Sequence, residues 1–160
     1  MITYPSKQVV REAAVSALIP SVTVTVAVDT AYVAARQGSN ISQGIYMMDN
    51  MVRSGSGGEG TLELSTVAPV GSLIAWSVVP IDVTAAGDGT SIAITGFTVS
   101  QGNVFGGSGY PRPQTAKGDY WMGQLMNQGS QTYQIQIKVT VGAIQPVSYF
   151  INWDPFITAR

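Results

Sequence analysis

The stretch that decides the fold is Tyr133-Gln134-Ile135-Gln136-Ile137-Lys138-Val139-Thr140-Val141, close to the end of the chain. Apolar and polar residues alternate along it, and this period of two is typical of a β-strand with one buried and one solvated face. A second segment follows it and carries much of the aromatic mass of the chain, reading Val147-Ser148-Tyr149-Phe150-Ile151-Asn152-Trp153-Asp154-Pro155-Phe156. Because so apolar a terminus would be a sticky patch if it were exposed, we expect both segments to lie in the core.

Pro155 has a positional meaning in this second segment. A proline cannot donate to the ladder of a sheet, so we expect the strand to end there, with Asp154 fixing the exit of the chain. We interpret the tetrapeptide Asn152–Pro155 as a structural anchor and not as a functional site.

Six further segments predict strands, because β-branched and apolar residues gather between Gly, Pro and Asn turns. They span residues 22–30, 45–50, 61–66, 73–79, 91–99 and 120–126. The four valines of the first should face the core, and Gly96 is a candidate β-bulge. The pattern predicts an all-β fold, an antiparallel β-sandwich (Ig-like or jelly-roll-like) of about seven or eight strands with a short N-terminal helix. A closed barrel is the alternative that the pattern leaves open.

The start of the chain differs from the rest. Residues 1–20 are expected to form an N-terminal segment, with a short helix from Ser6 to Ile19 that Pro20 closes, ahead of one β-sandwich domain over residues 21–160. Lys7 and Arg11 before an apolar run also resemble a signal peptide, but Glu12 and Pro20 oppose that interpretation. With no convincing signal peptide, we expect a cytoplasmic protein, in inclusions or released.

The composition excludes several classes of function. The chain has no Cys and no His, which removes disulfides, thiolate and imidazole metal sites, and Ser-His-Asp triads. It has 8 Lys and Arg against 9 Asp and Glu, none of them in a run, so nucleic acid and anionic membranes are poor partners. No segment is apolar enough over a sufficient length to span a membrane. Only 11% of residues are charged, and this low self-repulsion favours self-association.

The longest irregular stretch runs from Ser100 to Gly118. It is rich in Gly and lacks the Gly-Lys-Ser/Thr of a phosphate loop, so a nucleotide site is not expected. A structural loop is the simpler interpretation, but the stretch and its flank could also cradle a neutral ligand. The candidate ligand-binding residues are Asn103, Phe105, Tyr110, Arg112, Asp119 and Trp121. The second glycine-rich stretch, from Arg53 to Gly60, is expected to be a long hairpin connection.

No catalytic or metal-binding constellation is apparent. Asp82, Asp88 and Asp49 fit turns better than a calcium loop, which would need a regular series of oxygen ligands. Glu59 and Glu63, the only close pair of glutamates, are expected to be solvated. We expect no cofactor, and calcium only if the protein is a lectin.

Several motifs in a fixed order resemble a known family. They are Val26–Thr30, Ile45–Asn50, Gly58–Leu64, Val70–Trp76 and Tyr149–Ile157. Together they are similar to the bacterial inclusion body protein family, the group that contains the PixA and AidA proteins. Gly71-Ser72 stands where members commonly have Gly-Asp, and the segment before Pro20 has no counterpart.

The resemblance implies a small cytoplasmic β-protein without catalytic residues, made in stationary or quorum-sensing-dependent phase and associated with host interaction. Some members form intracellular inclusions. We therefore expect a non-enzymatic protein that forms dimers or higher homo-oligomers. The alternative is a lectin that binds neutral carbohydrate as a multimer, in which multivalency strengthens weak binding.

Overall fold

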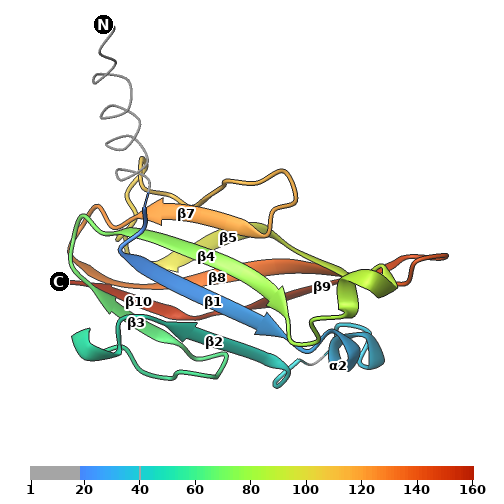
Figure 1. The fold of residues 1–160 in the computed structure, drawn as a ribbon. Helices are drawn as coiled ribbons and strands as arrows, with labels where there is room; N and C mark the ends of the chain where they lie inside the picture. Colours follow the sequence, from blue (N-terminus) through green and yellow to red (C-terminus); the bar gives the residue numbers. More distant parts are fainter. Residues whose placement is uncertain (1–18, 40) are drawn as a thin grey trace, which may run out of the picture.

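The computed structural model describes residues 19–39 and 41–160, and the helix expected from Ser6 falls outside this part of the chain except for Ile19. The described residues lie mainly in β-strands and in the turns and loops that join them (Figure 1). The strands are β1 (Val22–Val28), β2 (Ile45–Asp49), β3 (Ser65–Ala68), β4 (Leu73–Pro80), β5 (Ser91–Gln101), β6 (Arg112–Pro113), β7 (Tyr120–Gln124), β8 (Gly129–Val141), β9 (Val147–Trp153) and β10 (Phe156–Ala159). Between them lie one α-helix, α2 (Thr30–Ala35), and two single-turn helices, η1 (Val52–Ser54) and η2 (Ala85–Asp88).

The strands form two sheets, and both sheets are mixed. One sheet has the order β2-β1-β4-β7-β6, and the other has the order β3-β10-β8-β5, with β9 also paired to β8. The expected all-β class is confirmed. The expectation of wholly antiparallel pairing is wrong, because β1 pairs with β4 and β3 with β10 in parallel. The described residues contain ten strands where seven or eight were expected.

The inner faces of the two sheets share one core. The four valines of β1 are at most 1% exposed, as their alternation predicted. Trp76 on β4 and Tyr133 on β8 meet across the core, where the indole nitrogen donates to the Tyr133 hydroxyl at 3.2 Å. Phe97 and Phe105 pack around this pair with ring centroids 4.9 and 5.9 Å from that of Trp76. Offset and edge-on aromatic contacts of this kind add to the free energy of burial.

Strand β8 organises the second sheet. It pairs with β5 along one edge, through a bulge at Gly96, and with β9 and then β10 along the other. The register does not change between the last two, because Ile135 faces Trp153 and Thr132 faces Phe156. Strands β9 and β10 therefore run as one continuous strand along β8, interrupted at Asp154–Pro155. Pro155 interrupts the strand as expected, but its carbonyl still accepts from the Tyr133 amide at 3.1 Å.

The connection from β2 to β3 differs from the prediction. It is no hairpin, because β2 belongs to one sheet and β3 to the other. The strand expected over residues 61–66 begins only at Ser65, since Thr61 still bridges to Met47 on β2. Two side chains of the glycine-rich connection, Ser56 and Glu59, help to anchor it. The Val67 amide donates to the Ser56 hydroxyl at 2.9 Å, and the Asp49 amide donates to the Glu59 carboxylate at 2.9 Å.

Helix α2 was not predicted, because the strand was expected to continue to Thr30. Asp29 caps the helix, its carboxylate accepting from the Tyr32 amide at 3.0 Å. The helix ends where Gln37 and Gly38 take positive φ, and the Gly38 amide returns to the Val33 carbonyl at 3.0 Å. Six residues are too few to show a helical period in the sequence. No helix in the described ranges has the length and apolar character needed to cross a membrane.

Candidate functional site

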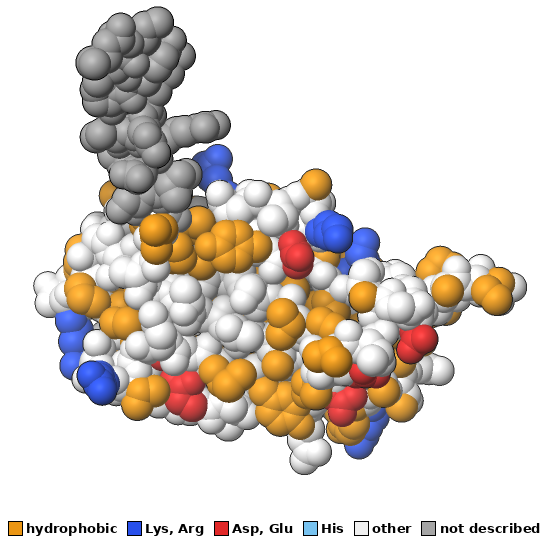
Figure 2. Space-filling model, in the orientation of Figure 1, with side chains coloured by type: hydrophobic (Ala, Val, Ile, Leu, Met, Phe, Trp, Pro, Cys, Tyr) orange, Lys and Arg blue, Asp and Glu red, His pale blue; other side chains and the backbone are white. Residues whose placement is uncertain are grey.

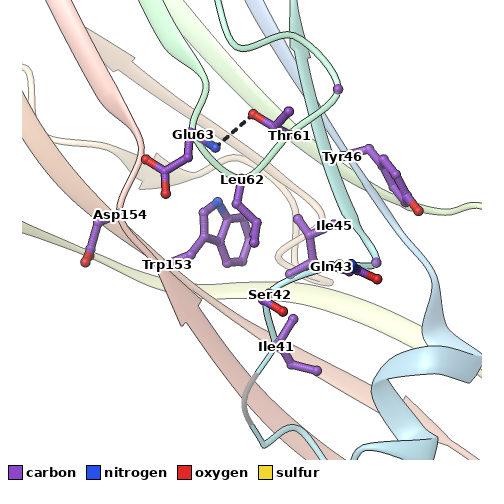
Figure 3. Close-up of a pocket in the computed structure, with 12 residues that line it drawn as sticks. Ile41, Ser42, Gln43, Ile45, Tyr46, Thr61, Leu62, Glu63, Trp153 and Asp154 are labelled. Atoms are coloured by element: carbon purple, nitrogen blue, oxygen red, sulfur yellow. Dashed lines mark hydrogen bonds between the residues drawn. The ribbon is translucent and has the colours of Figure 1, made fainter.

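A hollow of about 660 Å³ opens beside the end of β9. It is lined by residues 41–46, 60–63 and 153–154, and we refer to it as the β2–β9 hollow (Figure 3). Strand β2, the turn before β3, and the break between β9 and β10 each supply one wall. The hollow therefore lies where the margins of the two sheets meet.

The topology explains why a hollow forms at this place. Strand β3 runs beside β10, where the Phe156 amide donates to the Leu64 carbonyl at 2.9 Å. Before Leu64 the chain leaves this sheet and reaches β2 at Thr61. Farther back along β9, the loop after α2 comes close, since a Cβ on Gly38 would lie 3.4 Å from the Phe150 carbonyl oxygen. Between these two segments, no strand of the described residues pairs with the outer edge of β9.

The floor of the hollow is apolar. Trp153 is 7% exposed, and its indole nitrogen donates to the Met47 sulfur at 3.0 Å. Figure 3 shows the indole in the middle of the site next to Leu62, with Ile45 beside it and Ile41 farther away, beyond Ser42. Leu62 and Ile41 are only partly buried and pack against the core. A ligand in this hollow would therefore cover aliphatic side chains and the edge of an indole.

The rim of the hollow is polar, and its charged groups are acidic. Ser42, Gln43, Glu63 and Asp154 are exposed there, and no Lys or Arg is among the lining residues. The Asp154 carboxylate accepts from the Gln134 amide nitrogen at 3.1 Å, which fixes the chain where it leaves β9, as expected. Ionised carboxylates only accept hydrogen bonds, so the rim suits a partner that donates them.

This arrangement suits binding better than catalysis. The two carboxylates are exposed, and the chain has no His or Cys to act as a base or nucleophile beside them. Within residues 19–39 and 41–160, no three acidic side chains come together as metal ligands would. Asp82 caps its own turn, accepting from the Thr84 amide and hydroxyl at 2.8 and 2.7 Å, and these bonds lower the pKa of its carboxyl.

The residues predicted as a ligand site do not share one cavity. Tyr110 and Arg112 line a hollow of about 230 Å³. Asp119 lines another of about 430 Å³, together with Lys117 and Lys138. Both hollows are smaller than the β2–β9 hollow.

The other predicted residues contribute mainly to the fold. Phe105 is 2% exposed and lies in the aromatic core, so its ring presents no surface to a ligand. The Asn103 side chain is exposed, while its carbonyl accepts from the Asn127 amide nitrogen at 2.7 Å. Trp121 is half-buried against Phe97 and donates to the Gly118 carbonyl at 3.1 Å. The hydroxyl of Tyr110 donates to the Phe97 carbonyl.

The residues of the β2–β9 hollow were missed as a site. Trp153 and Asp154 had been identified, but as a structural anchor, and Leu62 only as part of a family motif, while Ser42 and Gln43 belong to no motif. Pro155 was the available signal, since a break in an edge strand marks a place where the pairing along its outer side changes. Which segment faces that break could not be read from the sequence.

Comparisons with known proteins show a protein with the same fold and the family to which this chain belongs. A crystal structure of an inclusion body protein, PixA, from Burkholderia cenocepacia J2315 superposes with a TM-score of 0.70 at 14% identity. The match covers 87% of this chain and 94% of that one, so the two proteins share a fold, and the resemblance stated from the sequence is confirmed at that level. The chain belongs to the family described as Domain of unknown function (DUF8788), which matches residues 20–145. No curated protein matches the sequence.

Proposed function

We propose that this protein is a non-enzymatic, self-associating protein of the cytoplasm that packs into ordered assemblies. One observation carries the proposal. The hairpin of β8 and β9 has no charged residue between Lys138 and Asp154, and it exposes Ile144, Val147 and Phe150. Exposed hairpins and edge strands are usually protected by charge, because an unprotected one pairs with other chains.

The surface as a whole supports the same function. Charged residues are 11% of the chain, and the net charge is −1. Ordinary soluble domains carry roughly twice this share of charge, and the resulting repulsion keeps their copies apart. The similar protein from Burkholderia cenocepacia is described as an inclusion body protein, which agrees with this proposal. Expression in stationary or quorum-sensing-dependent phase and a role in host interaction complete the proposal.

Sedimentation velocity over a wide concentration range tests self-association. We expect the weight-average sedimentation coefficient to rise with concentration, and overexpression to produce inclusions from folded protein. The double variant Val147→Lys, Phe150→Lys places charge on two exposed side chains of β9, one on each face of the strand, and should reduce both effects. A strict monomer at high concentration, together with no inclusions on overexpression, would refute the proposed function.

A second function is carbohydrate binding in the β2–β9 hollow. The hollow combines an indole edge and aliphatic side chains with acceptor groups from Glu63 and Asp154, a mixture that suits the apolar faces and hydroxyl groups of a neutral sugar. A glycan array read with and without calcium tests this alternative, with Glu63→Ala as the site variant and Asp88→Ala, an exposed carboxylate outside the hollow, as the matched control. Silence across a broad array would eliminate it.

A further inference from the structure

We propose that the hairpin tip of one copy, residues 142–146, inserts into the β2–β9 hollow of the next copy. This inference rests on the proposed self-association and names the two surfaces that carry it. The contact joins two different surfaces of the same chain, so it is heterologous. A tip in a hollow leaves the tip of the second copy and the hollow of the first free to bind again.

The tip is built to project. Figure 1 shows the β8–β9 hairpin extending beyond the sheets, and Figure 2 shows hydrophobic side chains at its end. Ile144 is 95% exposed. Ile144 is hardly buried by its own chain. Nearly all of the free energy that burial of its side chain could release must therefore come from contact with another molecule.

The turn at the tip packs closely against its own chain. Gly142 has a φ of 95°, and a Cβ there would lie 2.9 Å from the Gln145 carbonyl oxygen. At the base, Gly89 packs so closely on Ala143 that a Cβ would lie 2.8 Å from its Cα. These close contacts restrict the tip, so it loses less conformational entropy on binding than a loosely packed loop would.

The hollow matches the chemistry of the tip. Its floor of Leu62, Ile41 and the Trp153 edge is an apolar surface for Ile144. Its rim accepts hydrogen bonds through Glu63 and Asp154, and the Gln145 side chain can donate them. The tip carries no charge, so no ion has to be desolvated on its side of the contact.

The positions of the two features favour a second copy as the occupant. The tip and the hollow lie at opposite ends of β9, nine residues apart between Ile144 and Trp153, which in a strand is roughly 30 Å. One chain therefore cannot fill its own hollow. Contacts between opposite ends of a molecule repeat along one direction, and a repeat that does not close into a ring gives filaments or arrays.

Two variants with complementary defects test the contact. Ile144→Asp destroys the tip and leaves the hollow intact, while Ser42→Trp obstructs the hollow and leaves the tip intact. Both positions are exposed, and thermal unfolding verifies that both variants fold. In sedimentation velocity we expect each variant alone to stay monomeric at concentrations where the wild type assembles. An equimolar mixture should form dimers that grow no further. Val70→Asp, an exposed position outside both surfaces, should assemble like the wild type.

A disulfide gives an independent measurement, because the chain contains no cysteine. Ile144→Cys and Ser42→Cys proteins, mixed and mildly oxidised, should crosslink to each other at least tenfold faster than Val70→Cys crosslinks to Ser42→Cys.

The sedimentation results separate the two proposals. The tip-in-hollow contact is refuted, while self-association stands, if the wild type assembles and either Ile144→Asp or Ser42→Trp assembles equally well. The same holds if the wild type assembles and the mixture of these two variants stays monomeric. If the wild type is monomeric, the proposed function is refuted with it. Assembly unaffected by Ile144→Asp, with sugar binding lost in Ser42→Trp, would assign the hollow to carbohydrate.

Discussion

The indole nitrogen of Trp153 donates a hydrogen bond to the sulfur of Met47 at 3.0 Å, and this contact joins β9 of one sheet to β2 of the other. Both residues are at least nine-tenths buried, since Met47 is 0% and Trp153 7% exposed. The contact lies directly beneath the β2–β9 hollow. The residue that forms the floor of the candidate site therefore also holds the two sheets together.

Trp153→Ala should lower the free energy of unfolding by more than about 3 kcal/mol, the range for removal of a large buried aromatic side chain. Urea denaturation followed by circular dichroism measures the loss. Trp153→Phe keeps a ring and loses only the N–H group, so it should be clearly less harmful. An alanine variant that unfolds cooperatively at nearly the wild-type midpoint would show that this end of β9 is not core.

Tyr133→Phe should cost roughly 1–3 kcal/mol, because it leaves the buried Trp76 N–H without its acceptor. Chemical denaturation at pH 7 measures this cost. Tyr120→Phe, on a strand margin and only partly buried, serves as the matched control. Equal stabilities of the two variants would contradict a role for the Trp76–Tyr133 hydrogen bond.

The same tyrosine predicts a loss of stability in alkali. Burial raises the pKa of Tyr133 far above its usual range, and the hydrogen bond from Trp76 only partly offsets this. The unfolded chain releases the phenolic proton near pH 10, whereas the folded chain keeps it, so the contribution to stability is complete below about pH 10 and falls as the pH rises further. Tyr133→Phe should flatten the decline in melting temperature above that pH. An unchanged slope would count against this assignment.

Glu59→Gln should raise the melting temperature at pH 7. Burial raises the pKa of the Glu59 carboxyl, the hydrogen bond from the Asp49 amide lowers it, and the negative charge of Asp49 raises it again. A raised pKa means that the stability linked to this proton is present in acid and is lost as the pH rises through the folded-state value. The amide of Gln still accepts from the Asp49 N–H and carries no charge. It can also donate to Asp49 Oδ2, which is buried without a partner among the described residues.

The gain from Glu59→Gln should therefore shrink between pH 7 and pH 4, as wild-type Glu59 becomes protonated. Differential scanning calorimetry at the two pH values measures it. Glu63→Gln removes the same charge from an exposed position and is the matched control. A gain that is equal at both pH values would exclude repulsion between Glu59 and Asp49 as its cause.

Gly102→Ala should destabilise the fold more than Gly60→Ala. Both glycines have positive φ, 92° and 77°, so both substitutions strain the backbone by about 1–2 kcal/mol. Only Gly102 is also enclosed, because a Cβ there would lie 2.3 Å from the Ser130 carbonyl oxygen, while a Cβ on Gly60 meets nothing within 4 Å. The difference between the two unfolding midpoints isolates the steric part. Equal midpoints would mean that the start of the Ser100–Gly118 loop can move away from β8.

That loop is more structural than its composition suggests. The buried amide of Gln131 accepts from the Val104 amide at 2.9 Å and donates to the Gly102 carbonyl at 3.1 Å. Phe105 then enters the core. A glycine-rich sequence indicates an irregular path, but it does not tell whether that path is anchored, because the anchors, such as the Gln131 side chain, come from distant segments.

The sequence by itself determined the main strands of the core and the faces that they bury. The alternation in β1 and β8 and the apolar run of β4 place the side chains that form the core, since a period of two is a local property. The same local chemistry placed the bulge at Gly96 and the break at Pro155.

Only the tertiary structure decided which strands pair and where a site forms. The parallel pairs β1–β4 and β3–β10 and the departure of the chain from the second sheet before Leu64 depend on contacts between distant segments. The β2–β9 hollow results from that departure, because β3 covers β10 but stops short of β9. A hollow is a space between elements, so its walls can be read only after the elements have been packed.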